Sequence, residues 1–255
     1  MRHNFVNDIG DYAKYALLRA ICASSDTPMR LGVIWYLTDH AESNGYGRKS
    51  AHLTHDGWED LDPELLAAMR RIEDARQGQS ALNVALIESS GILPPGTMYF
   101  SEPLPRVVGN AQHRAAERAT WFRRARNAVE GTDLVFLDPD NGLQVRSAPL
   151  SAPRSCKYVT VAEISALLHD GTGVVLYQHG NRAAWPLQRA DVCAQIASGT
   201  GRSLTTRSLR FGAFGVRAFF CIAASRPIAD AVERGLGLLQ HRVAGWDRSR
   251  YLLIE

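Results

Sequence analysis

Short runs of apolar residues alternate along this chain with stretches in which apolar residues recur every three or four positions. The runs have the length and β-branched content of buried strands, and the stretches have the period of amphipathic helices. Strands are predicted at 31–37, 97–100, 134–137, 173–177, 204–210, 217–224 and 251–254. The alternation predicts an α/β fold with a mostly parallel, doubly wound, Rossmann-like sheet, in which 204–210 and 217–224 form a C-terminal antiparallel pair.

Capping residues mark where several predicted helices begin. Asp11 is predicted to cap the first helix, Asp62 precedes Pro63 at the start of the next, and Thr160 with Glu163 has the spacing of a capping box. Helices are predicted to follow Asp11 and to cover 63–76, 80–90, 106–129, 161–169, 185–198 and 227–241. Most predicted strands are thus separated by a helix, which parallel pairing requires.

The bulk properties are those of a globular protein. Hydrophobic residues make up 45% of the 255 residues and charged residues 22%, and there is neither an internal repeat nor a linker. We therefore predict a single Rossmann-like domain over 1–255, with a loop and helical excursion at about 40–80. The four cysteines form no CxxC pair, and no apolar run of about 18 residues occurs, so a cytoplasmic protein without a membrane segment is expected. The sequence leaves the oligomeric state open.

The net charge of +3 comes from arginine, because lysine occurs only at Lys14, Lys49 and Lys157. Arginine is well suited to phosphate recognition, so RNA or DNA is permitted as a partner without being required. The helix predicted at 106–129 has two interpretations, a surface helix with its aromatic pair in the core or a face for a phosphate backbone. Its arginines are Arg114, Arg118, Arg123, Arg124 and Arg126.

The candidate chemistry is concentrated after the strand at 134–137. The apolar run leads directly into Asp138, Pro139, Asp140 and Asn141. Open α/β sheets bind ligands at the carboxyl ends of their strands, so these four residues are predicted to lie in the active site.

Two other predicted strands also end in polar residues. The strand at 31–37 leads into Thr38, Asp39, His40 and Glu42, which are candidates for cofactor binding, for a metal site or for a hydrogen-bonded loop. The strand at 173–177 leads into Gln178, His179, Asn181 and Arg182. Because parallel strands end at the same edge, the polar segments that follow these two strands and the strand at 134–137 are expected to meet in one crevice.

Four of the polar residues have both an ordinary and a functional interpretation. His179 is either a hydrogen-bonded structural histidine or a general base or phosphate ligand. Lys14 stands near a helix start, where a cation is unfavourable unless it pairs with Asp11, Asp8 or a bound anion. Lys157 and Tyr158 are either a satisfied pair after a loop or contacts to the substrate.

Several of these segments occur in the order known from a protein family. The segments resemble adenine-N6 methyltransferases that modify large-subunit ribosomal RNA, over roughly residues 1–180 and as landmarks rather than as a continuous match. The chain is also similar to a set of uncharacterised bacterial proteins with a Gly-Asp-Tyr-x-Lys-Tyr start and a Leu-Asp-Pro-Asp-Asn-Gly core. The landmarks are Arg2-His3-x-Phe5, Asp11-x-x-Lys14-Tyr15, Thr38-Asp39-His40-Ala41 and Leu137-Asp138-Pro139.

The resemblance implies a class I methyltransferase fold that binds S-adenosylmethionine after the first strand. Asp138 would accept a hydrogen bond from the target amine, and Pro139 would shape the loop that holds the flipped base. Asp140 and Asn141 stand where the family has a second proline and the aromatic residue that stacks on the base. The family's Gly-x-Gly turn is likewise replaced, by residues 42–45.

Three functions follow from these residues. The first is a methyltransferase-like enzyme that modifies a nucleic-acid base or another amine, with Asp39 and Glu42 on the cofactor and Lys14 near the cofactor's carboxylate. The second is a nuclease or phosphodiesterase in which Asp138 and Asp140 bind Mg²⁺ or Mn²⁺. Lys157, His179 and Arg182 would then stabilise charge or transfer protons. The third is a non-catalytic module that binds nucleic acid or protein through the arginine-rich helix.

Overall fold

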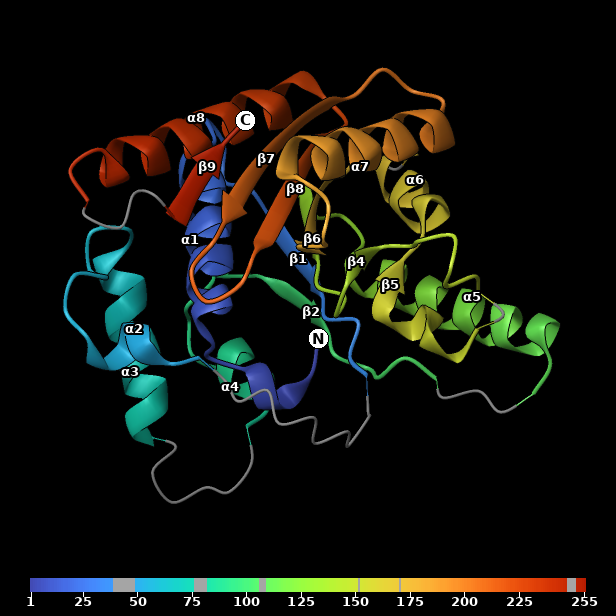
Figure 1. The fold of residues 1–255 in the computed structure, drawn as a ribbon, viewed down its shortest axis with the longest axis horizontal. Coiled ribbons are helices and arrows are strands. Elements are labelled where there is room, and N and C mark those ends of the chain that lie inside the picture. Colours follow the sequence, from blue (N-terminus) through green and yellow to red (C-terminus); the bar gives the residue numbers. More distant parts are fainter. Residues whose placement is uncertain (39–48, 76–81, 106–108, 151, 170, 247–250) are drawn as a thin grey trace.

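A seven-stranded sheet forms the centre of the molecule (Figure 1). The structure is a computed structural model, and it describes residues 1–255 except 39–48, 76–81, 106–108, 151, 170 and 247–250. The strand order is β2-β1-β3-β6-β8-β7-β9, and a separate parallel pair is formed by β4 (Gly142–Leu143) and β5 (Tyr158–Val159). The strands of the large sheet are β1 (Leu31–Ile34), β2 (Met98–Phe100), β3 (Leu134–Leu137), β6 (Gly173–His179), β7 (Thr205–Phe211), β8 (Arg217–Ala223) and β9 (Leu252–Ile254).

Strands β2, β1, β3 and β6 are parallel, whereas β8 pairs antiparallel with both β6 and β7. The predicted Rossmann-like sheet and its antiparallel C-terminal pair are therefore confirmed. Ile34 pairs with Leu137, and Leu137 pairs with Leu176, so three parallel strands reach the same edge in register. At that edge His179 pairs with Arg217, which brings the start of β8 beside the end of β6.

Helices cover both faces of the sheet. Helices α1 and α8 pack against each other on one face, with α3 against α1, and their apolar side chains join Phe136, Val175 and Phe219 of the sheet. The other face is covered by α5, α6 and α7. The helices are α1 (Ile9–Ala23), α2 (Ala51–Thr54), α3 (Pro63–Ala75), α4 (Ala85–Glu88), α5 (Ala111–Ala128), α6 (Val161–His169), α7 (Trp185–Thr200) and α8 (Arg226–Val243), with 3₁₀ turns at His3–Phe5 and Pro153–Lys157.

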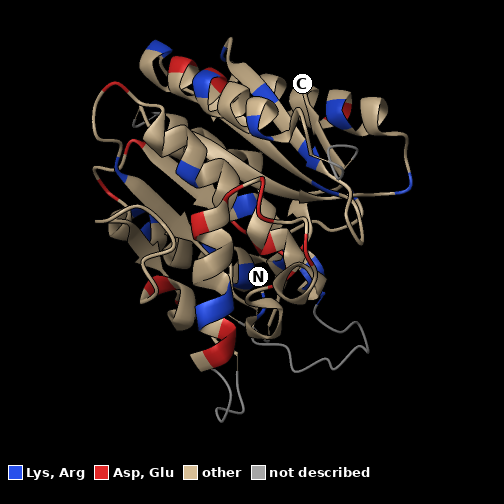
Figure 2. Cartoon of the chain, turned by 90° about the vertical axis from the view of Figure 1, so that its left-hand side faces the viewer, with Lys and Arg blue, Asp and Glu red and all other residues tan. Residues whose placement is uncertain are grey.

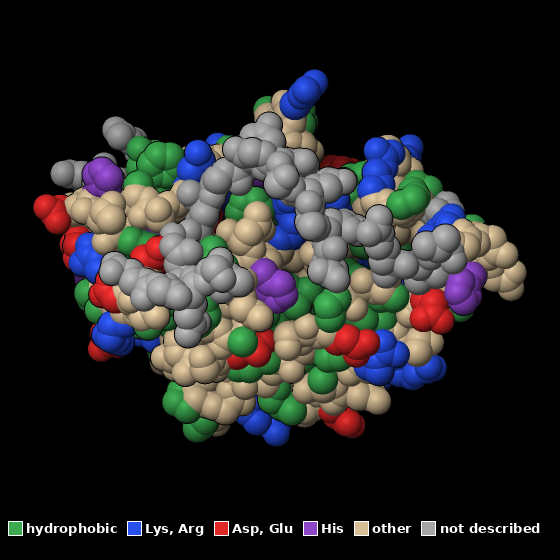
Figure 3. Space-filling view, turned by 90° about the horizontal axis from the view of Figure 1, so that it is seen from below, with side chains coloured by type: hydrophobic (Ala, Val, Ile, Leu, Met, Phe, Trp, Pro, Cys, Tyr) green, Lys and Arg blue, Asp and Glu red, His purple; other side chains and the backbone are tan. Residues whose placement is uncertain are grey.

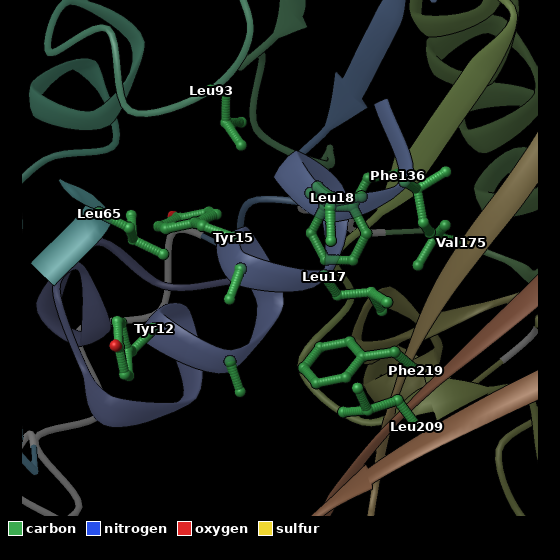
Figure 4. Packing of buried hydrophobic residues seen from close by; sticks show 14 of the residues in the cluster. Tyr12, Tyr15, Leu17, Leu18, Leu65, Leu93, Phe136, Val175, Leu209 and Phe219 are labelled. Carbon is green, nitrogen blue, oxygen red and sulfur yellow. The ribbon is translucent and has the colours of Figure 1, made fainter. Parts of the chain in front are cut away.

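Helix α1 lies in the core because its side chains are apolar on nearly all sides. Leu17 and Leu18 point towards Phe136, Val175 and Phe219 of the sheet (Figure 4). The helix begins one turn earlier than the sequence predicted, since Asp8 rather than Asp11 is the N-cap and accepts a hydrogen bond from the Gly10 amide at 2.8 Å. Asp11, placed inside the helix, is thereby free to face the sheet edge.

Other predicted boundaries also changed. The strand predicted at 31–37 ends at Ile34, because Tyr36 adopts a left-handed conformation with φ of 48°. In the described part of the helix predicted at 80–90, which excludes 80 and 81, α4 is the helical segment. In the described part of the helix predicted at 106–129, which excludes 106–108, α5 starts at Ala111, where Asn110 caps it by accepting from the His113 amide at 2.9 Å. The segment 161–169 is helical as predicted, and the Thr160 and Glu163 capping box forms in both directions.

Acidic and basic residues are interspersed along the helices, as expected for solvated outer faces (Figure 2). Within the described residues, we find no helix with both the length and the apolar character needed to cross a membrane.

Candidate functional site

A pocket of about 350 Å³ lies at the carboxyl ends of β3 and β6. Its walls come from the N-terminal segment, the start of α1 and the turn between β7 and β8. Both Asp138 and His179 line it, so the polar segments that follow these two strands meet as the sequence analysis expected. This is the edge at which open α/β sheets bind ligands.

A buried triad of Asp11, Lys14 and Asp138 forms the base of the pocket. The Lys14 Nζ lies 2.7 Å from Asp11 Oδ1 and 2.7 Å from Asp138 Oδ2, and all three side chains are nearly inaccessible to solvent. The ammonium group also lies within 6 Å of the ring centres of Tyr15, Trp35 and Phe136. Lys14 therefore holds the carboxylate of Asp138 in one position while compensating its charge.

Burial and ion pairing act in opposite senses on the pKa values of Lys14 and Asp11. Burial alone would lower the pKa of Lys14, but the carboxylates of Asp11 and Asp138 outweigh it and hold the pKa above its usual value. For Asp11, burial outweighs the neighbouring ammonium and raises the pKa to about 6. Lys14 consequently carries its charge throughout the physiological pH range.

Asp140 belongs to a second cluster beside the triad. The Met1 amino group lies 3.1 Å from Asp140 Oδ1 and donates to the carbonyl oxygen of Asp138 at 2.8 Å. Thr38 donates its hydroxyl hydrogen bond to Asp140 Oδ2 at 3.2 Å, and Arg2 approaches the same oxygen at 3.6 Å. Burial would raise the pKa of Asp140, but the amino group and Arg2 lower it below the usual value.

The side chain of His179 lies at the rim of the pocket and forms a hydrogen bond with another residue of its own strand. Its Nδ1 lies 3.1 Å from the Tyr177 hydroxyl. Burial lowers the pKa of the imidazole, and the guanidinium of Arg217 on the neighbouring strand lowers it further, against the opposing effect of Asp140. The ring is therefore neutral at pH 7, a state in which it can accept a proton.

All three lysines of the chain line this pocket, although arginine is by far the commoner basic residue. Lys14 is buried in the triad. Lys49 is exposed and Lys157 half-buried, and neither makes an ion pair with another described residue. Among the described residues, the two ammonium groups at the mouth of the pocket thus have no acidic partner, a feature that would attract an anionic group on a ligand.

Arg217 is a site residue that the sequence did not indicate, and Asp8, a candidate partner of Lys14 in the sequence, pairs with Arg217 instead. The Arg217 Nη2 lies 2.9 Å from Asp8 Oδ1, which links the start of β8 to the N-cap of α1. Gly10 makes this possible, since a Cβ at that position would collide with the Arg217 side chain. The two residues are 209 positions apart, and no local pattern signals their contact.

The remaining predicted site residues differ in where they lie. Pro139 and Asn141 line the pocket, whereas Tyr158 and the exposed Arg182 do not belong to its lining. Gln178 is buried and holds the chain after β3, because its Oε1 accepts from the Leu143 amide at 2.9 Å and its amide donates to the Asn141 carbonyl at 3.2 Å. Asp39, His40 and Glu42 lie outside the described residues.

The arginines of α5 do not form one continuous basic surface. Arg118 is buried and makes a bidentate ion pair with Glu163, and Arg124 pairs with Glu102. Arg123 and Arg126 line a separate cavity of about 910 Å³ at the opposite edge of the sheet. Figure 3 shows Lys and Arg side chains in several separate groups, with Asp and Glu between them, on the lower face of the molecule.

The carboxylates predicted for a metal ion have cationic partners. Asp138 is held by Lys14, and Asp140 by the Met1 amino group and Arg2. Among the described residues there is no group of three or more His, Cys, Asp or Glu side chains arranged to hold a metal ion. In this part of the chain, both carboxylates are therefore paired with cationic groups of the protein itself.

Comparisons with known proteins find no match for this chain among family models, curated proteins or solved structures.

Proposed function

We propose that the protein is a methyltransferase-like enzyme that transfers a methyl group from S-adenosylmethionine to an amine of a nucleic-acid base or a related molecule. The observation that carries this proposal is the position of Asp138. Its carboxylate lies at the carboxyl end of a central parallel strand, 3% exposed, with one oxygen fixed by Lys14. Among the described residues Lys14 is the only donor to this carboxylate, so the other oxygen can accept a hydrogen bond from an exocyclic amine.

The charge and size of the pocket support the same assignment. Lys49 and Lys157 at its mouth suit an acceptor that carries phosphate, and the neutral imidazole of His179 suits a reaction that releases a proton. A volume of about 350 Å³ is at the lower end of the range of ligand pockets, so its described part holds one ring system rather than acceptor and cofactor together.

The cofactor, when bound, supplies a methyl group activated by a sulfonium sulfur. Of the residues predicted to hold it after the first strand, Asp39, His40 and Glu42 lie outside the described part of the chain, and Thr38 donates to Asp140. Lys14 was predicted to face the cofactor's carboxylate, but its charge is already shared by two aspartates. Within the described part, the pocket therefore fits the acceptor and not the methionine end of the cofactor.

Calorimetry with S-adenosylmethionine and S-adenosylhomocysteine, followed by transfer of a labelled methyl group to adenine and cytosine nucleotides, tests the proposal. We expect the Asp138→Asn variant to retain cofactor binding and to lose on the order of 100-fold in transfer rate, the loss typical of removing one oriented polar group at a reacting centre. Asp133→Asn is the matched control, because Asp133 directly precedes the same strand, at its opposite end, and is partly exposed. Absence of cofactor binding at millimolar concentration would refute the proposal.

A further inference from the structure

We propose that Phe214 is the aromatic surface of the pocket, on which a planar ring of the ligand stacks. Phe214 lies in the turn between β7 and β8 and lines the same pocket as Asp138. The inference rests on the proposed function, since it specifies the class of acceptor as a nucleobase or another planar heteroaromatic amine.

Burial does not explain a phenylalanine at this position of the turn. Its side chain is 57% exposed, so it contributes little burial, and its φ of 53° lies in the left-handed region. Asparagine and glycine adopt that region readily, whereas a bulky residue there is strained. Strained residues of this kind cluster at ligand sites, where the surrounding structure holds them in place.

Arg217 holds the turn in position. Its guanidinium donates to the carbonyl oxygens of Ala213 at 3.1 Å and Gly215 at 3.3 Å, on either side of Phe214, and also pairs with Asp8 at the start of α1. Ala213 is fully buried beside it. In Figure 1 this turn lies at the lower end of β7 and β8, beside the start of α1. The phenyl ring is therefore presented to the pocket by a turn that is braced on both sides.

The other described residues that line the pocket are less suited to stacking on a planar ligand ring. The segment after β3 has Asp140 and Asn141 where an aromatic residue would stack on a base in the resembled methyltransferases. Of the other phenyl and phenol rings that line the pocket in the described part of the chain, Phe5 is covered by the Arg2 guanidinium 4.7 Å from its centre. Tyr177 is half-buried against Phe219, and its hydroxyl group is hydrogen-bonded to His179. Phe214 is exposed, whereas Phe5 and Tyr177 are only partly exposed.

Affinity for adenosine and for inosine, which lacks the exocyclic amine, tests the inference. Calorimetry is done with saturating S-adenosylhomocysteine present, so that a cofactor site for adenosine is filled. We expect Phe214→Ala to weaken both nucleosides equally, by about 10- to 100-fold, because stacking does not read the amine. The matched control is Leu187→Ala on α7, an apolar side chain that is 68% exposed and is not among the residues that line the pocket, which should leave both affinities unchanged.

A second variant separates ligand binding from folding. Phe214→Asn suits the left-handed turn, so the midpoint of urea unfolding should stay the same or rise while nucleoside affinity falls as in Phe214→Ala. A fall in both would show that Phe214 is a structural turn residue and would overturn the inference. Equal nucleoside affinity in Phe214→Ala and the unaltered protein, or no nucleoside binding at millimolar concentration, would also overturn it.

A different experimental result would contradict the proposed function. If Asp138 accepts the amine, adenosine should bind more tightly than inosine, and Asp138→Asn should abolish this difference. A protein that stacks both nucleosides on Phe214 without preferring adenosine would retain the stacking site and lose the proposed role of Asp138.

Discussion

Lys14 is the residue on which the charge balance of the pocket depends. It lies between two buried carboxylates, and the pair with Asp138 joins positions 124 apart in the sequence. The sequence indicated that Lys14 needed an anionic partner and named Asp11 as one candidate. It gave no sign of the second partner, because Asp138 reaches Lys14 only when α1 packs across the end of β3.

Replacing Lys14 by methionine should destabilise the protein strongly at neutral and alkaline pH. The change leaves Asp11 and Asp138 buried without a cation, which typically costs about 3–5 kcal/mol in unfolding free energy. Urea unfolding should show this loss at pH 8 and a smaller one at pH 5. The sign follows from burial, which already raises the pKa of Asp11 to about 6, so that protonation at lower pH removes the uncompensated charge.

Lys49→Met is the control for this prediction, since it removes an exposed ammonium group from the same pocket. Its unfolding free energy should change by no more than about 0.5 kcal/mol. An equal loss for Lys14→Met at pH 5 and pH 8 would mean that packing, and not charge, accounts for the role of Lys14.

At the scale of elements, the closest approach described between α1 and α8 depends on Gly235. A Cβ at Gly235 would lie 2.7 Å from the Cα and 2.8 Å from the amide nitrogen of Ile21, both backbone atoms that no side-chain rotation can move. These two helices form the most extensive helix contact of the fold and carry much of the core on their face of the sheet. Gly235 is therefore a packing requirement within a helix that otherwise disfavours glycine.

Gly235→Ala should lower the unfolding free energy by about 1–3 kcal/mol, the usual loss when a packed interface is forced apart. Gly237→Ala, two positions further along α8, should instead raise it by about 0.5–1 kcal/mol, because a Cβ there meets no atom within 4 Å and alanine is the better helix former. Thermal and urea unfolding of the two variants measure the difference. Similar effects of both changes would show that α1 and α8 are not packed as closely as described.

The contact between α5 and α6 includes an interaction that the local sequence pattern does not reveal. The capping box of Thr160 and Glu163 was recognised from spacing alone, and it forms. Glu163 also accepts two hydrogen bonds from Arg118 at 2.8 and 2.9 Å and one from the Tyr36 hydroxyl at 3.3 Å. Arg118, one of the arginines considered for phosphate recognition, therefore joins α5 to α6 through its ion pair with Glu163.

For the whole molecule, the sheet predicts a gradient of stability from its centre to its edges. Strand β3 is fully buried and hydrogen-bonded on both sides, whereas β9 pairs with β7 alone and is partly exposed. Backbone amides open with free energies that follow burial and pairing.

Native-state hydrogen exchange should therefore show the amides of β3 exchanging only through global unfolding. The amides of β9 should exchange through local opening, faster by at least about tenfold and with little dependence on denaturant. Amides of β9 as slow as those of β3 would show that the C-terminal strand is part of the central stability unit.

The sequence alone determined most of the helices and strands, and the strand ends at which the polar side chains of the candidate site gather. Apolar runs such as 134–137 and 173–177 predict strands because side-chain patterns repeat over a few residues, and the polar residues that follow each run belong to the same local signal. The strands of the α/β sheet, the antiparallel final pair and the positions of Asp138 and His179 could therefore be predicted.

Only the tertiary structure decided which groups meet at that edge. The pairing of Lys14 with Asp138, the contact of Arg217 with Asp8 and the presence of Phe214 at the pocket join residues that are far apart in the chain. Such contacts follow from strand order and helix packing, which bring distant segments together and leave no periodic trace in the residues themselves. The physical character of the pocket, charge-balanced at its base and aromatic at its mouth, is for that reason a property of the fold.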